Sequence, residues 1–129
     1  MLRRDVLPLF IMTLLIALVA PSTATANPVP PERVTRNTEA LIRFAPNQGL
    51  TPTTFPQRAT LVYRYAVSPS LYTTANVRND DYRYVASEQR WYMHITFPGA
   101  VQLWNRFYEG STITYQGRSY KVEYGRQLN

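Results

Sequence analysis

Apolar and polar residues alternate along much of the chain after residue 58, which is the period expected of β-strands with one buried face. The clearest alternation runs from 90 to 97, where polar residues separate four large apolar ones. These four are Trp91, Met93, Ile95 and Phe97. Residues 59–67 alternate in the same way, and their apolar set is Leu61, Tyr63, Tyr65 and Val67. We predict a strand in each segment, with the apolar set facing the core.

Between these two strands the pattern is weaker and is interrupted by turn-forming residues. Residues 71–77 predict a weak strand, and residues 82–86 predict a short one. The stretch 78–81 (Arg-Asn-Asp-Asp) predicts a turn that separates them.

The C-terminal part predicts a β-hairpin. Residues 112–115 and 118–124 flank Gln116-Gly117, and Gly117 can adopt the positive φ that a tight hairpin turn requires. On the second strand, Tyr120, Val122 and Tyr124 are expected to share one face.

One stretch has helical rather than strand spacing. Residues 99–109 place six apolar side chains at intervals of one, three and four, and Glu109-Gly110 follows as a helix C-terminus would. These six are Ala100, Val101, Leu103, Trp104, Phe107 and Tyr108. We therefore expect one short helix at 99–109 that packs over an open end or edge of the sheet.

The predicted fold is a mainly β, small single domain of five or six short antiparallel strands, barrel- or roll-like, with that one helix. The expected organisation is residues 1–26 as a signal peptide or membrane anchor, 27–57 as a Pro-rich extended segment, and 58–129 as the β-rich domain. Within the middle segment, residues 32–45 are compatible with a short helix or a strand.

The first 26 residues have the features of a secretory signal peptide. Arg3 and Arg4 precede an apolar run at 6–20, and Ala24 and Ala26 form the small-residue pattern that signal peptidase cleaves after. As a helix this run reaches about 22 Å, which is short of a hydrocarbon core of about 30 Å. Export to the periplasm or the extracellular space is expected, and retention by residues 6–20 as a membrane anchor remains the alternative.

Composition limits the chemistry that the chain can perform. It has 129 residues, no Cys and a net charge of +6, so one domain without disulfides, thiol chemistry or a Cys-based zinc site is expected. The bases are almost all Arg and are scattered along the chain, whereas nucleic-acid binding favours a continuous basic stripe. A protein or glycan partner is therefore favoured over nucleic acid.

No arrangement of residues indicates an enzyme. His94 is the one imidazole, and no Gly-x-Ser-x-Gly motif accompanies it. The acidic residues, including Glu88, show no spacing typical of a glycosidase pair. Asn79-Asp80-Asp81 lacks the spacing of a dedicated calcium loop, so we predict no metal, no cofactor and no catalysis.

Tyr and Arg lie side by side at several positions, and this pairing is typical of binding surfaces because both side chains combine large contact area with hydrogen bonding. We predict a non-catalytic accessory or assembly subunit that docks on a protein partner, within an envelope or membrane complex, at the outer face of a membrane. The predicted docking residues are Tyr63, Arg64, Tyr82, Arg83, Arg90 and Tyr92.

The alternative is a glycan-binding module of the cell envelope, since exposed aromatic rings can stack on sugars. Its candidate residues are Trp104, Tyr115, Tyr120 and Tyr124. The pattern from 108 to 120 (Tyr-x-Gly-x-x-Ile-x-Tyr-x-Gly-x-x-Tyr) resembles the closing hairpin of small chitin-binding modules. It lacks the Trp that usually follows in those modules, and it names no family for this chain.

The predicted cleavage of the signal peptide can be checked on protein purified from its native host. We expect an intact mass and an N-terminal sequence that place the first residue at Asn27, because cleavage after Ala26 fits the small-residue pattern. A chain that begins at Met1 would contradict this and would identify residues 6–20 as an anchor.

Overall fold

A computed structural model describes residues 36–129. The predicted signal peptide at 1–26 and residues 27–35 of the predicted Pro-rich segment lie outside the described residues. The compact unit extends from Thr35 to Asn129. It therefore includes sequence that we had assigned to the segment before residue 58.

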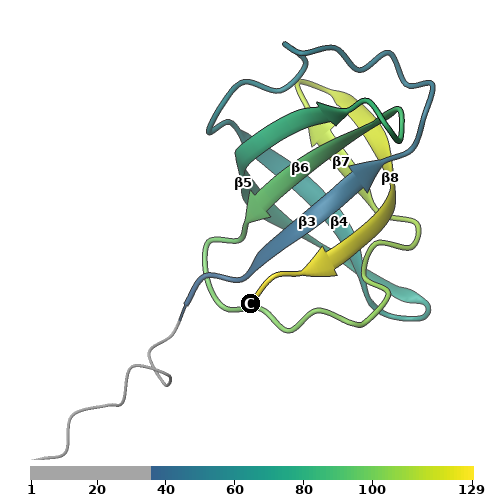
Figure 1. The fold of residues 1–129 in the computed structure, drawn as a ribbon. Coiled ribbons are helices and arrows are strands. Elements are labelled where there is room, and N and C mark those ends of the chain that lie inside the picture. Colours follow the sequence, from purple (N-terminus) through teal and green to yellow (C-terminus); the bar gives the residue numbers. More distant parts are fainter. Residues whose placement is uncertain (1–35) are drawn as a thin grey trace, which may run out of the picture. The chain divides into compact units, whose positions relative to one another are not determined.

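Six antiparallel strands close into a barrel, in the ring order β3-β6-β5-β4-β7-β8 (Figure 1). The strands are β3 (Glu39–Phe44), β4 (Thr60–Ser68), β5 (Leu71–Val85), β6 (Arg90–Thr96), β7 (Thr112–Tyr115) and β8 (Arg118–Gln127). The mainly β, barrel-like prediction is confirmed. The hairpin at Gln116-Gly117 is also present, and both residues have positive φ, at 50° and 80°.

β3 completes the barrel by pairing with β6 on one side and β8 on the other. Its inward side chains are Ala40, Ile42 and Phe44, all fully buried. The intervening Leu41 and Arg43 face outward and are half-buried. This alternation shows a strand in the described part of 32–45, where the sequence had left helix and strand open.

The predicted turn at 78–81 is wrong, because β5 is one continuous strand with a bulge at Asp80. The bulge moves the inward face from odd to even positions, so Val77 and Asn79 point inward before it and Tyr82 after it. Asn79 is fully buried, and its Nδ2 donates to the Pro56 carbonyl (2.9 Å). Tertiary hydrogen bonds thus hold turn-forming residues inside a strand.

The predicted helix at 99–109 is also wrong. Residues 100–104 have no regular structure, and residues 105–110 form turns in which amides donate three residues back, as from Phe107 to Trp104 (3.0 Å). Its backbone bonds to other elements instead: Val101 exchanges two hydrogen bonds with the Thr38 hydroxyl, and the Phe107 carbonyl accepts from Ala66. The apolar spacing reflects a cover over the barrel end, not a helix face.

A second bulge, at Glu123 in β8, changes another sequence assignment. Val122 pairs with Phe44 and Tyr124 pairs with Arg43, so Glu123 is the extra residue. Tyr120 and Val122 share a buried face, but Tyr124 is exposed, so the three side chains do not share one face as predicted. Gly125 takes the inward position, where a Cβ would lie 3.0 Å from Phe107 Cζ.

Aromatic side chains fill both ends of the barrel. Phe107 and Phe55 are both buried. Phe107 belongs to the stretch between β6 and β7, at the barrel end near the C-terminus, and Phe55 belongs to the loop after β3, which lies at the opposite end (Figure 1). Phe55 stacks on Phe44 with ring centroids 5.4 Å apart and contacts Tyr120 edge-on at 5.1 Å. The long loop at 45–59 is therefore part of the core.

Replacement of Phe55 tests this role. Phe55→Ala should lower the free energy of unfolding by about 3–5 kcal/mol, because it removes a buried ring and leaves a cavity. Leu71→Ala, at a side chain 60% exposed, should change it by less than about 0.5 kcal/mol. Urea denaturation of both variants measures this, and equal effects would contradict the assignment of Phe55 to the core.

Candidate functional site

The candidate site lies on the hairpin formed by β5 and β6, at the barrel end that Phe55 fills. Tyr84 pairs with Trp91, and Arg83 pairs with Tyr92. Because successive side chains of a strand point to opposite faces, the two pairs lie on opposite sides of the hairpin. One side turns toward the loop after β3, and the other continues the outer surface of the barrel.

The outer side contains a groove of about 490 Å³. It runs over β3, β5, β6 and β8 and the C-terminal residues after β8. Its lining is Leu41, Asp81, Arg83, Val85, Glu88, Tyr92, His94, Arg126 and Leu128. Apolar side chains, a Tyr and Arg residues together give this groove the composition of a protein-binding surface.

A network of ion pairs fixes the side chains beside the groove. Glu123 accepts from Arg43 Nε (2.7 Å) and Arg90 Nε (2.9 Å), and the Tyr92 hydroxyl donates to Glu88. Glu123 is the bulged residue of β8, so the bulge brings its carboxylate between the two guanidinium groups. The hydrogen bond from Arg43 to Tyr92, with further contributions from Glu123, raises the pKa of Arg43.

His94 also lies in this groove. Its Nε2 is 2.7 Å from Glu39 Oε1, and no other hydrogen bond to the ring occurs within residues 36–129. Asp80 is held by Arg78 and by the Thr96 hydroxyl, and the Arg78 guanidinium holds the pKa of this carboxyl below its usual range. These contacts give both groups a structural role.

The structure separates the six predicted docking residues. Arg83 and Tyr92 line the groove, and Arg90 lies beside it. Tyr82 is on the opposite side of the hairpin, half-buried against Trp91. Tyr63 is fully buried, so it packs in the core rather than on a surface.

Arg64 lies elsewhere on the barrel. It is exposed on β4, away from the hairpin, and its guanidinium is 4.0 Å from the centre of the Tyr72 ring. The predicted docking residues that come together are thus Arg83, Arg90 and Tyr92.

The four glycan candidates do not form one site. Trp104 and Tyr124 line a cleft of about 340 Å³ at the barrel end near the C-terminus. Tyr115 and Tyr120 lie at the other end, where both contact Phe55. Tyr120 is only 6% exposed and belongs to the core.

Several groove residues were missed by the sequence analysis. Leu41, Val85, Arg126 and Leu128 come from three separate stretches of the chain. Only the closure of the barrel by β3 brings these stretches together. The signal that could have found them is the set of outward-facing residues in each alternating segment. We had not combined these sets across strands.

Within residues 36–129, no group of three His, Asp or Glu side chains is placed to hold a metal ion. In the same range, no helix is long and apolar enough to cross a membrane. Comparison of the chain with protein-family models, curated proteins and solved structures finds no match.

The Tyr82 hydroxyl gives a pH-dependent test of the hairpin's position. It donates to the Thr51 carbonyl (2.8 Å), and burial raises its pKa to about 12. Tyrosine in the unfolded chain ionises near pH 10, so this group's contribution to stability is present below that pH. It is lost as the pH rises toward about 12.

We expect the free energy of unfolding to fall less steeply above about pH 10 in Tyr82→Phe than in the unchanged protein. Urea denaturation at several alkaline pH values measures the slope, and an absorbance titration should lose its tyrosinate component near 12. Identical slopes in the two proteins would show that Tyr82 is not buried as described.

Proposed function

We propose that this chain is a non-catalytic, exported accessory subunit that docks on a protein partner at the outer face of a membrane, and that the groove on the outer side of the β5–β6 hairpin is the docking surface. The observation that carries the proposal is the groove itself. It combines apolar Leu41, Val85 and Leu128 with Tyr92 and Arg83, a combination typical of interface centres.

The closed barrel supports docking through side chains. Each described strand pairs on both sides, so this part of the chain offers no free sheet edge to which a partner could add a strand. The exposed surfaces, including the groove, are the remaining means of recognition.

Charge favours a partner with an acidic segment. Residues 36–129 contain eleven Arg and Lys and six acidic side chains; five of the six acids lie within ion-pair distance of an Arg, and the sixth, Glu39, contacts His94. Arg126 in the groove has no such pairing with these acids, so a partner carboxylate could pair with it. The proposed partner therefore offers an apolar side chain to Leu128 and Val85 and an acid to Arg126.

Site-specific photo-crosslinking in the native host tests the surface. A photoreactive residue in place of Val85 should form a cross-link to one discrete protein. The same residue in place of Val62, which is 41% exposed on β4, should not. Cross-linking at both positions alike, or at neither, would refute the proposal.

A matched pair of charge substitutions checks the same groove. Leu128→Asp should abolish the Val85 cross-link, since it places a charge among the apolar contacts. Leu71→Asp makes the same change at an exposed Leu at the start of β5 and should leave the cross-link intact. Both variants should unfold at the same urea concentration as the unchanged protein.

A further inference from the structure

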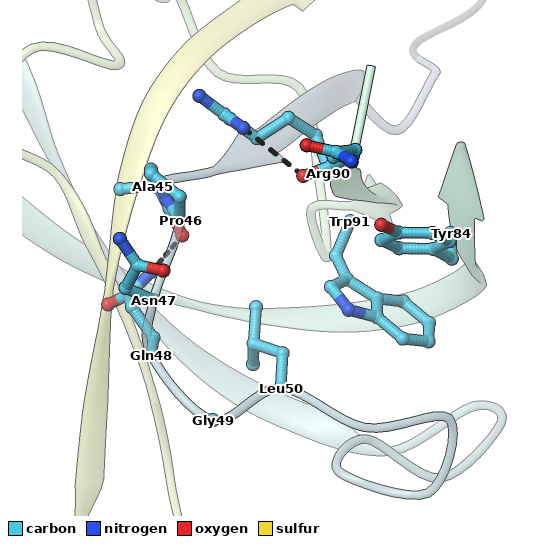
Figure 2. Close-up of a pocket in the computed structure, with 10 residues that line it drawn as sticks. Ala45, Pro46, Asn47, Gln48, Gly49, Leu50, Tyr84, Arg90 and Trp91 are labelled. Carbon is cyan, nitrogen blue, oxygen red and sulfur yellow. Dashed lines mark hydrogen bonds between the residues drawn. The ribbon is translucent and has the colours of Figure 1, made fainter. Parts of the chain in front are cut away.

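A second hollow lies on the other side of the same hairpin. It has a volume of about 570 Å³ and opens between the loop after β3 and the turn between β5 and β6 (Figure 2). Its lining is Ala45, Pro46, Asn47, Gln48, Gly49, Leu50, Tyr84, Gln89, Arg90 and Trp91. Figure 2 shows Trp91 and Tyr84 on one side of the opening, Asn47 and Gln48 across from them, and Leu50 between.

Trp91 and Tyr84 form a rigid aromatic wall. The Trp91 ring stacks on Tyr82 with centroids 4.5 Å apart and planes at 15°, and Tyr84 lies tilted at 5.2 Å from it. Tyr82 in turn contacts Phe55 in the core edge-on at 5.1 Å. Tyr84 itself is 48% exposed. Tyr82 therefore holds Trp91 from the core side, while the Tyr84 ring stays accessible in the hollow.

The loop after β3 and the turn between β5 and β6 offer amide groups. Gln48 is fully engaged, because its amide bonds the backbone of Ala45 and Lys121. Asn47 and Gln89 make no side-chain hydrogen bond within residues 36–129, and both hold positive φ, at 63° and 54°. Their turns therefore present two amides that can each donate and accept.

The hollow is lined in part by polar groups, and none of them is acidic. No Asp or Glu belongs to its lining, and its one charged group is Arg90. Arg90 donates through Nε to Glu123 and through Nη1 to the carbonyls of Glu88 and Gln89. These bonds fix the guanidinium at the rim and leave Nη2 for a ligand.

We propose that this hollow binds a pyranose ring of an oligosaccharide. A pyranose has an apolar face of C–H groups and a rim of hydroxyls, each of which donates and accepts a hydrogen bond. The exposed Tyr84 ring, which is tilted 53° from the Trp91 ring beside it, fits the apolar face, and the amides of Asn47 and Gln89 fit the hydroxyls. A nucleotide fits less well, because a single partly neutralised Arg gives little to hold phosphate.

This inference does not rest on the docking proposal. The sugar would bind the side of the hairpin that carries Trp91 and Tyr84, and the protein partner would bind the side that carries Tyr92 and Arg83. Either site can fail in an experiment without affecting the other.

Tryptophan fluorescence provides a direct readout. The chain has two Trp residues, and Trp104 lies at the opposite end of the barrel, so Trp104→Phe leaves Trp91 as the one reporter. The probes are the tetramers of N-acetylglucosamine, which is neutral, and of galacturonic acid, which is acidic. Saturable change in Trp91 emission with either tetramer is expected, and calorimetry on the unchanged protein should give the same affinity.

Two substitutions in the hollow should weaken binding of the tetramer. Tyr84→Ala removes an exposed stacking ring and should reduce affinity about tenfold. Asn47→Gly removes the amide while it preserves the positive φ, and it should also reduce affinity. Unchanged urea midpoints would show that both variants fold.

Tyr124→Ala is the matched control. Tyr124 is 37% exposed and lines the cleft near the C-terminus, so its removal should leave affinity unchanged. Loss of binding in Tyr124→Ala but not in Tyr84→Ala would overturn the proposal and would place the sugar in that other cleft. Absence of binding by both tetramers, or a response to ATP or a Pro-rich peptide alone, would also overturn it.

Discussion

The barrel depends on β3, which hydrogen bonds β6 along one side and β8 along the other. Without it, the remaining strands would form an open sheet with two free edges and an exposed apolar face. Closure buries Ala40, Ile42 and Phe44 and removes the free edges from the described part of the chain. Recognition is then left to side chains on the outer surface and to the loops at the barrel ends.

The bulge at Asp80 explains why one hairpin carries two different surfaces. It shifts the inward face of β5 by one residue, so Tyr82 and Tyr84 follow the inner side and Arg83 the outer side. The hydrogen bonds from Asn79 to the loop at 55–59 hold the bulge in place. A stretch that has the local composition of a turn therefore determines which residues line the hollow and which line the groove.

The sequence predicted the elements whose signal is local. β4, β6 and the hairpin at Gln116-Gly117 follow from alternation and turn chemistry, and all three are present. The continuous β5 could not be predicted, because Asn79 Nδ2 donates to the Pro56 carbonyl in the loop, and Thr96 of β6 and Arg78 of β5 donate to Asp80. The predicted helix at 99–109 does not form for a related reason, since the backbone of this stretch hydrogen bonds to neighbouring parts of the barrel.

The site was predictable only in part. Arg83, Arg90 and Tyr92 come together because they share the outer side of one hairpin, which alternation alone indicates. Tyr63 has the same Tyr-Arg neighbour as Tyr82, but its place in the middle of β4 points it into the core. Leu41 and Leu128 could not be included, because their proximity follows from the ring order of the strands.

Arg90 is the residue at which the two sides of the hairpin meet. Its Nε is paired with Glu123 on the outer side, while the same side chain lines the hollow beside Trp91. A ligand that pulled this guanidinium toward the hollow would weaken its bond to Glu123, which would then rely on Arg43. Coupling between the sites, where it exists, therefore has a defined physical route through one carboxylate shared by two Arg side chains.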